Sequence, residues 1–349
     1  METRIFVHVN ILYGLKIILK SLFVLVFLAL AGCGGRSAAD STREAEDLFV
    51  VRFDNAVEDY LRTGTFSSLL RLRTDFPAET RILVEDVLRL GSASDDNVGE
   101  KLRRFYADTT LVRLRADVGR KFGNFAPYER ELRRAFARMR RVCPDLPVPT
   151  VYTLNSAFRQ SVVVSDRLLG ISLDKYMGAD YPLYRRYFHP CQRVGLDPSR
   201  LPQDCLVYYL MARYAPDAGS GASTLLEEML MRGKIYWAVA RVLDLPLSEA
   251  ASACPKSQAW YAAHEREAWA AISRPELLAS CDTALLAPLL DYTTPQGYFA
   301  DPYSRGVGLW IGLRIVDSYM KKHPAISVGE LLEMTDCRGL LDGAGYRPA

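Results

Sequence analysis

Hydrophobic residues recur at helical spacing along most of the chain, while four short stretches are rich in the apolar and β-branched residues typical of strands. Residues 48–54 form the first of these stretches. The other three, 150–154, 160–166 and 168–173, lie close together and are joined by turn-rich residues, which predicts a small antiparallel meander. The first strand adds a fourth member to it. The predicted sheet is therefore a minor part of the fold.

Helical segments account for the rest of the pattern. Ser223 or Thr224 precedes one of them and Ser327 precedes another, and such residues cap helix N-termini. The predicted helices cover residues 55–63, 77–89, 97–121 as one or two helices, 127–142, 201–214, 224–243, 258–273, 275–290 with a break, 306–322 and 327–334. This order predicts an α+β fold that is mainly helical, with a small antiparallel sheet packed against many helices in a single domain over 48–349.

The helix predicted over 127–142 combines an apolar stripe with a strongly basic remainder. Its apolar residues fall at positions i, i+3, i+4 and i+7, namely Leu132, Ala135, Phe136 and Met139. Arginines occupy much of the rest, namely Arg130, Arg133, Arg134, Arg138, Arg140 and Arg141. The simplest interpretation is a solvated helix face. The alternative is a basic surface for anionic phospholipid or an acidic partner.

A basic region followed by an apolar run opens the chain and ends at Leu-Ala-Gly-Cys33. Lys16 and Lys20 precede the apolar residues 21–30, which is the order of a secretory signal. The run is short for a transmembrane helix, and Lys20 interrupts it. A cysteine directly after Leu-Ala-Gly resembles the bacterial lipobox. The resemblance implies that residues 1–32 are removed, and that Cys33 receives a thioether-linked diacylglycerol before its amine is acylated.

Residues 33–47 then form a tether between the predicted lipid and the folded domain. They are small and polar after Cys33, which is typical of a flexible linker. Each buried acyl methylene contributes about 0.8 kcal/mol, so two or three chains make desorption from a bilayer negligible. The sequence therefore predicts a protein that is lipid-anchored to a bacterial membrane through Cys33.

The overall composition is that of an ordinary globular protein, with 49% hydrophobic and 24% charged residues. The formal net charge is +3; the predicted leader carries three basic residues and one acidic residue, so the mature chain keeps a formal charge of +1. That balance gives no reason to expect a nucleic acid as partner. The sequence holds no P-loop, G-x-G-x-x-G or G-x-S-x-G motif, and no cofactor is predicted.

Six cysteines remain after Cys33, an even number in an exported chain, and they allow 15 connectivities. We predict Cys191 with Cys205 and Cys254 with Cys281, because each pair flanks a short excursion of the chain. The alternative is that the six are buried free thiols. No C-x-x-C pair supports a zinc ribbon or a thioredoxin-like site.

Taken together, the segments after the tether resemble the GldB-type gliding-motility lipoproteins of Bacteroidetes. The resemblance covers nearly the whole mature chain, in order, through residues 52–54, 170–178, 180–184, 224–226, Met229, 233–236, Glu267, Trp269, 308–312, Tyr319, Met320, 330–332 and 345–348. It implies a membrane-tethered envelope protein linked to gliding and to the type IX secretion apparatus. In such lipoproteins an acidic cluster after the lipidated cysteine is associated with surface export. Its absence after Cys33 favours an anchor in the outer membrane that faces the periplasm.

A weaker resemblance is to gluzincin-type metallopeptidases, which carry H-E-x-x-H on a helix. Two histidines at i and i+4 bind zinc on one helix face, and the glutamate is the general base. The matching stretch here is 226–230, in which Glu227 stands at the position of the base. Leu226 and Leu230 stand at the positions of both zinc ligands, and a leucine side chain has no lone pair for a metal. The resemblance therefore implies a peptidase-like scaffold that has lost its metal.

Two functions follow from these observations. The first, which we expect, is a non-catalytic structural or interaction component of the envelope that has protein partners there. The second is a hydrolase, with or without a metal, or a ligand binder that acts in the retained cleft. Its candidate residues are polar or aromatic side chains on helices that should converge, namely Glu227, Glu228, Lys234, Glu265, Arg305 and Trp310.

Overall fold

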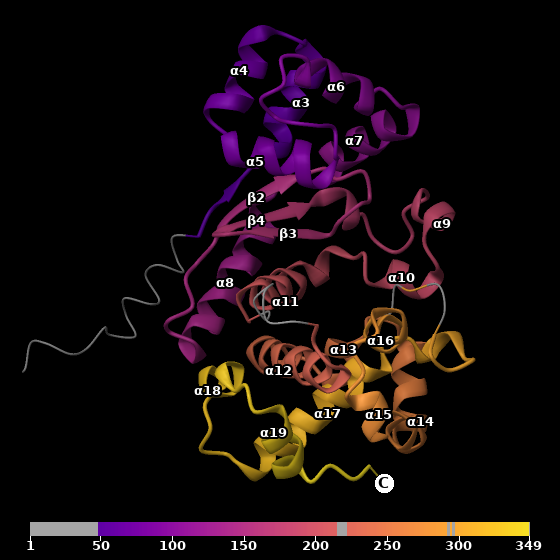
Figure 1. Ribbon diagram of the computed structural model, residues 1–349. Helices are drawn as coiled ribbons and strands as arrows, with labels where there is room; N and C mark the ends of the chain where they lie inside the picture. Colours follow the sequence, from indigo (N-terminus) through magenta and orange to yellow (C-terminus); the bar gives the residue numbers. More distant parts are fainter. Residues whose placement is uncertain (1–47, 215–221, 292–293, 295–296, 349) are drawn as a thin grey trace, which may run out of the picture.

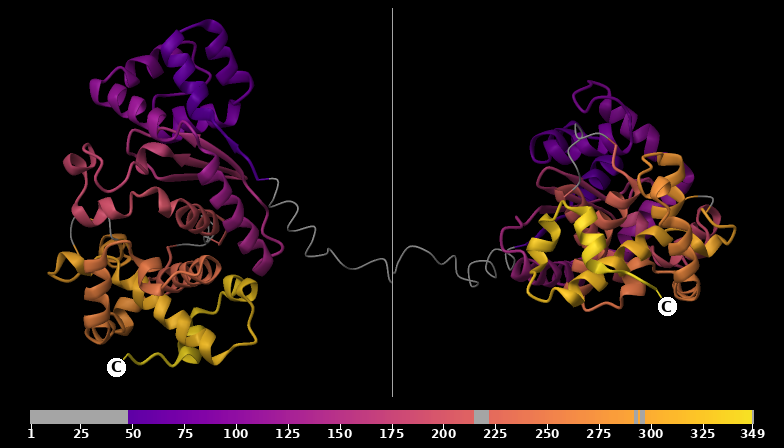
Figure 2. Two further views of the ribbon diagram at one scale, coloured as in Figure 1. Left: turned by 180° about the vertical axis from the view of Figure 1, so that it is seen from behind. Right: turned by 60° about the horizontal axis from the view of Figure 1, so that its bottom comes forward.

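The structure is a computed structural model and describes residues 48–214, 222–291, 294 and 297–348. The predicted leader, Cys33 and the whole predicted tether lie outside the described residues. The described chain is arranged in tiers, with one group of helices above a small sheet and the remaining helices below it (Figure 1). Seen from behind, the N-terminal and C-terminal helices again lie at opposite ends (Figure 2, left). A mainly helical α+β fold is therefore confirmed.

The upper tier consists of the helices that follow the first strand. They are α3 (Phe53–Thr63), α4 (Phe66–Thr74), α5 (Pro77–Arg81) continued by a π-helix (Ile82–Val87), α6 (Val98–Tyr106) and α7 (Thr109–Lys121). The apolar faces of α3 to α6 pack together with Tyr152 and Leu154 of the sheet, whereas Leu114 and Val118 of α7 belong to the cluster with Val151 and Leu169. Helix α4 was not predicted, although Thr65 accepts a hydrogen bond from the Ser68 amide as its N-cap.

The sheet is mixed and not the antiparallel meander that the sequence predicted. Its strands β1 (Val50–Val51), β2 (Thr150–Leu154), β3 (Val162–Ser165) and β4 (Leu168–Ser172) lie in the order β1-β2-β4-β3. Strand β4 is parallel to β2 and antiparallel to β3, and β1 is parallel to β2. The prediction was wrong because it assumed that strands adjacent in sequence pair with one another.

A buried carboxylate fixes the loop that joins β2 to β3. Asp174 follows β4, and its side-chain oxygens accept the backbone N–H groups of Ser156 at 2.8 Å and of Phe158 at 2.6 Å. Both donors belong to the loop that leaves β2. The loop is thereby held across the end of β4, and β3 pairs on the outer edge of the sheet. The first strand is also shorter than predicted, because the apolar residues from Phe53 onward have helical spacing and form α3.

Two helices cover the other face of the sheet. Helices α8 (Ala126–Val142) and α11 (Leu201–Tyr214) pack against Val151, Leu169 and Ile171 in one apolar cluster. The chain between β4 and α11 forms only short helices, α9 (Tyr184–Tyr187) and α10 (Pro190–Val194) with 3-10 turns beside them. The predicted boundaries of α8 and α11 agree with the structure to within one residue at each end.

The lowest tier is built around two long helices, α12 (Leu225–Leu243) and α17 (Val307–Lys322), which lie against each other. The shorter helices around them are α13 (Leu247–Ala251), α14 (Pro255–Ile272), α15 (Pro275–Leu278), α16 (Thr283–Leu290), α18 (Val328–Glu333) and α19 (Cys337–Ala344). Thr224 and Ser327 cap α12 and α18, as predicted. Among the helices of the described residues, none has the length and apolarity that crossing a bilayer requires.

The disulfide pairing differs from the one predicted. The structure joins Cys191 to Cys254, with 5.0 Å between their Cα atoms, and so ties α10 to the start of α14. Cys205 points into the core from α11 and is fully buried, whereas Cys281 is an exposed free thiol. Both predicted pairs were wrong because closeness in sequence was used in place of closeness in space.

Removing this bond should destabilise the protein by about 2–4 kcal/mol. The bridge closes a loop whose ends are 63 positions apart, and in the chain-entropy model a loop of this size restricts the unfolded chain strongly. We expect Cys254→Ser to lower the midpoint of urea unfolding, and Cys281→Ser to leave it unchanged. Equal midpoints for both variants under oxidising conditions would contradict the assigned bridge.

Candidate functional site

The helix that resembles a metallopeptidase helix is α12, and its would-be ligand positions are apolar. Leu226 and Leu230 are 6% and 0% exposed and belong to the cluster formed with α14, α16 and α17. Glu227, at the position of the base, accepts hydrogen bonds from the Thr224 amide at 2.8 Å and hydroxyl at 2.9 Å. Thr224 in turn accepts from the Glu227 amide, so the carboxylate is half of a capping box.

The next two polar candidates on α12 also have structural partners. Glu228 pairs with Arg232 one turn later, at 3.1 Å. Lys234 is 7% exposed, and its ammonium donates to the carbonyl oxygens of Leu332 at 3.4 Å and Met334 at 2.5 Å, at the end of α18. Burial lowers the pKa of Lys234. These bonds fasten α18 onto α12.

Glu265 and Trp310 are the two candidates that contact each other. The Trp310 indole N–H donates to Glu265 Oε2 at 3.0 Å, while Arg314 Nε and the Tyr346 hydroxyl donate to Oε1 at 3.1 and 2.6 Å. The Glu265 carboxylate thus joins α14, α17 and the segment after α19. The carbonyl oxygen of Arg305 accepts the hydroxyl of Tyr261, whose ring stacks on that of Trp310.

The six candidates therefore do not form one site. Within the described residues, the structure holds no group of three or more histidine, cysteine, aspartate or glutamate side chains placed to bind a metal ion. A cleft that gathers Glu227, Lys234 and Glu265 is not formed, because each is directed to a different neighbour.

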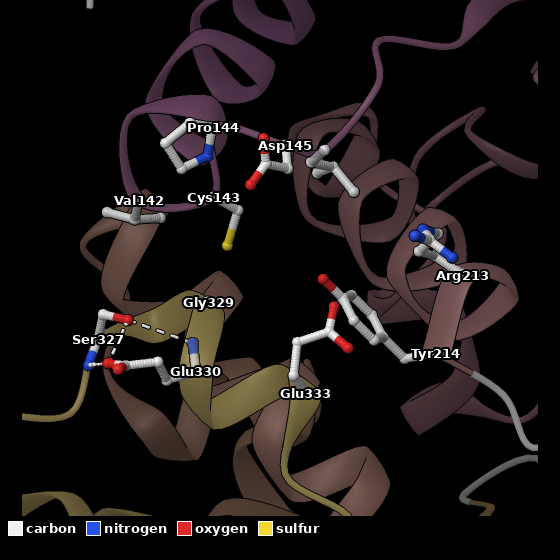
Figure 3. A pocket seen from close by; sticks show the side chains of 11 residues that line it. Val142, Cys143, Pro144, Asp145, Arg213, Tyr214, Ser327, Gly329, Glu330 and Glu333 are labelled. Atoms are coloured by element: carbon white, nitrogen blue, oxygen red, sulfur yellow. Dashed lines mark hydrogen bonds between the residues drawn. The ribbon is translucent and has the colours of Figure 1, made fainter. Parts of the chain in front are cut away.

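A cavity of about 290 Å³ lies elsewhere, where the ends of α8 and α11 meet α18 (Figure 3). The Cys143 thiol points into it from one side, and the Tyr214 hydroxyl and Glu333 carboxylate face each other on the opposite side. Burial, together with the nearby Glu333 charge, raises the pKa of Cys143 to about 11. A thiol with this pKa stays protonated near neutral pH, so the cavity holds no activated cysteine nucleophile.

Asp204 on α11 is a buried polar residue that the sequence pattern did not indicate as functional. It accepts the hydroxyl of the fully buried Tyr176 at 2.9 Å. Burial raises the pKa of Asp204 to about 6, and the charge of Arg200 and the Tyr176 hydrogen bond oppose this shift. Tyr208, one turn later on α11, is 43% exposed. Tyr176 stands in a tyrosine-rich stretch, but no pattern indicated that it meets α11.

The comparisons with known proteins concern the chain as a whole. Residues 36–348 match the model of a family described as gliding motility protein GldB. The chain belongs to this family. No curated protein and no solved structure matches it.

Membership of the GldB family confirms the resemblance drawn from the ordered segments. It associates the chain with gliding motility and with lipoproteins of this kind. Several segments that carry the resemblance now have a structural explanation. Residues 52–54 join two tiers, Thr224 caps α12, and Gly233 and Gly312 bring α12 and α17 together. The GldB pattern in this chain therefore coincides with contacts that hold the tiers together.

We predict that Asp204→Asn changes the pH dependence of stability. The unfolded chain releases this proton near 3.8 and the folded protein near 6, so the folded state binds more protons between these values. The contribution of Asp204 to the unfolding free energy is complete below pH 4 and falls as the pH rises to 6. Asparagine does not ionise, so the variant does not lose this stability, and its side chain can still accept the hydrogen bond from the Tyr176 hydroxyl. We expect the variant to gain about 1–2 kcal/mol on the wild type between pH 4 and 7, measured by urea unfolding.

Asp180→Asn is the matched control, because Asp180 is a 96% exposed carboxylate. It removes the same formal charge at the surface. An identical change of the pH profile in both variants would contradict a specific effect of burial at Asp204.

Proposed function

We propose that the protein is a lipid-anchored, non-catalytic component of the bacterial cell envelope that acts with gliding motility or the type IX secretion machinery. Family membership supports the association with motility. The Leu-Ala-Gly-Cys33 motif supports the lipid anchor, and the lack of acidic residues directly after Cys33 supports an outer-membrane anchor that faces the periplasm. The role of the folded domain is then to hold envelope proteins at that membrane.

The observation that supports a non-catalytic role is that the polar side chains of α12 make structural contacts. Glu227 is engaged in a capping box, and Lys234 holds the end of α18. Leu226 and Leu230 occupy the positions from which histidines would bind zinc. A general base must reach the proton that it abstracts, and Glu227 is instead bonded to the backbone of its own helix. The helix that carries the peptidase resemblance thus serves the fold.

The test compares a variant of the lipid anchor with a variant of Glu227. Each variant is expressed in a host strain from which the gene for this protein has been deleted. Glutamine also completes a capping box at this position, so Glu227→Gln removes the carboxylate and preserves the helix. We expect Glu227→Gln to restore gliding or type IX secretion fully, and Cys33→Ala to abolish both membrane retention and function. Loss of function in Glu227→Gln with unchanged stability, or stoichiometric zinc in the purified protein, would favour the hydrolase instead.

A further inference from the structure

Strand β3 forms one border of the sheet and, among the described strands, pairs only with β4 (Figure 1). The amide of Ser172 donates to the carbonyl oxygen of Ser161 at 3.0 Å, so the ladder between the two strands begins with a hydrogen-bonded pair. Bonded and non-bonded pairs alternate along an antiparallel ladder. Val163 therefore bonds to β4, whereas Val162 and Val164 direct their N–H and C=O groups away from it.

The outward groups of Val162 and Val164 form a row of two donors and two acceptors with the two-residue period of a strand. Within the described part of the chain, no other backbone group bonds to them. The strand also lacks the usual protection of a free edge, because it contains no charged residue, no proline and no bulge. This edge is therefore able to accept one more strand.

The helices near β3 pack on its two faces. Val162 and Val164 belong to the apolar cluster formed with α11, whereas Val163 packs against the cluster of the upper tier. Side chains stand roughly perpendicular to a sheet, so these contacts lie at right angles to the outward backbone groups. Val162 is 5% exposed, whereas Val163 and Val164 remain partly exposed. Val164 is thus the more accessible of the two outward residues.

The opposite border of the sheet is built differently. Strand β1 contains only the two residues Val50–Val51, and the chain turns into α3 directly after it. The carbonyl oxygen of Leu48, just before β1, accepts a hydrogen bond from Nε of Arg133 at 2.9 Å. Short strands and occupied backbone groups are ways in which proteins protect a sheet edge. Since β1 has this protection and β3 lacks it, β3 is the edge suited to a partner.

Building on the proposed function, we propose that an extended segment of an envelope protein adds to β3 as a fifth strand and pairs with the backbone of Val164 and Val162. An extended polypeptide offers donors and acceptors at the spacing of this edge, which a small molecule does not. A flexible segment carries no helices, so it can follow the edge between the upper tier and α11. A second copy of this chain would have to bring its own tiers beside these.

The side chains of β3 also indicate which segments fit. Val162, Val163 and Val164 are all β-branched and alternate between the two faces of the sheet. Cross-strand neighbours of such residues are favourable when they are β-branched or aromatic. In this mode of recognition the backbone supplies the affinity and alternate side chains supply the specificity.

The first experiment uses the mature Cys33→Ala protein, which lacks the predicted lipid. A displayed library of linear peptides of about ten residues is selected on this protein and counter-selected on its Val164→Pro form. Proline removes the outward N–H group and is tolerated on the free side of an edge strand. We expect peptides rich in β-branched and aromatic residues that bind the protein with Val164 at least about tenfold more tightly. A library that yields no such peptide would overturn the proposal.

A scan of backbone N-methylation along the selected peptide tests the geometry without altering the protein. Each methyl group removes one N–H donor. Alternate residues of an added strand face β3, so every second N-methylation should raise the dissociation constant about tenfold, and those between should leave it nearly unchanged. A scan without this two-residue period would show that the peptide does not add as a strand.

Phe49→Pro is the matched control, because it places a proline at the opposite border of the sheet, on a residue that is 64% exposed. This variant should bind the peptide as tightly as the protein with Phe49. An equal loss in the Phe49 and Val164 variants would reject β3 as the site. Hydrogen exchange of the unaltered mature chain gives a second measure: the bound peptide should slow exchange within residues 161–165, and protection elsewhere alone would also reject β3.

Two further measurements separate this proposal from its alternatives. Light scattering that shows a dimer, which the peptide dissociates, would identify a second copy as the occupant and overturn the proposal. In the host strain, Val164→Pro with Cys33 intact should stay in the membrane and lose gliding or secretion. Peptide binding itself needs neither lipid nor gliding, so its failure leaves the lipid anchor standing, and failure of the Cys33→Ala test leaves the β3 edge standing.

Discussion

Replacing Gly312 by alanine should destabilise the protein by about 3 kcal/mol or more. A Cβ atom at this position would lie within 2.7 Å of the carbonyl carbon of Met229 on α12, and closer still to its oxygen. On the other side of the contact, a Cβ atom on Gly233 would lie 2.5 Å from the carbonyl carbon of Gly312. The two helix backbones touch here, so neither can accept a methyl group without moving. The surrounding cluster is fully packed, and separating the helices would open it.

The measurement is urea unfolding of Gly312→Ala beside Gly119→Ala. Gly119 lies within α7, and a Cβ atom there would have no atom outside its own helix within 4 Å. Alanine is the better helix former by about 1 kcal/mol, so the control should be neutral or stabilising. A Gly312→Ala protein as stable as Gly119→Ala would show that α12 and α17 lie further apart than in the structure.

The helices could be predicted from the sequence because their signals are local. Helix α12 begins directly after Thr224 and ends near Leu243, as the spacing of its apolar residues and its capping residue predicted. Helix α4 escaped prediction because Phe66 and Leu70, two of its apolar residues, are exposed and blur the amphipathic pattern. Local signals thus suffice where a helix buries one face and fail where it exposes apolar residues.

The strand order could not be predicted, because β2 pairs with β4 and not with β3, its neighbour in the sequence. Asp174 accepts hydrogen bonds from the backbone amides of Ser156 and Phe158. This role could not be predicted, because nothing in the sequence distinguishes Asp174, which stands next to Lys175, from an aspartate at the surface. The bridge between Cys191 and Cys254 has the same origin, since its two cysteines meet only once α10 and α14 are in place.

Among the candidate site residues, roles that depend on neighbours in the sequence could be predicted, and roles that depend on distant residues could not. The capping role of Glu227 follows from Thr224 three residues earlier, a local pattern. The partners of Glu265 are Trp310, Arg314 and Tyr346, which are 45, 49 and 81 positions away. The position of Glu265 on a predicted helix therefore suggested that it lines a cleft. In the folded chain, its distant partners show that it links α14 to α17 and to the C-terminal segment.

Asp54→Ala should cost about 3–5 kcal/mol, because it breaks a largely buried ion pair at the junction of the upper tier and the sheet. Asp54 is 5% exposed and accepts two hydrogen bonds from Arg52, at 2.9 and 2.8 Å, and one from the Thr153 hydroxyl of β2. Arg52 also donates to the carbonyl oxygen of Phe122 at 2.8 Å. Removing the carboxylate leaves the Arg52 charge without its partner in a poorly solvated position, which is more costly than losing the pair's own attraction.

The matched control for this prediction is Asp59→Ala, on the same helix α3. Asp59 pairs with Arg62 at 2.8 Å, but the two side chains are 41% and 70% exposed, and such pairs contribute little. Urea unfolding should therefore separate the two variants by several kcal/mol. Asp54→Asn preserves an acceptor for Thr153 and should fall between them, because it removes the charge and retains a hydrogen bond. If Asp54→Ala and Asp59→Ala unfold at the same midpoint, the pair between Arg52 and Asp54 does not join the tiers, and the apolar cluster around Phe53 must do so alone.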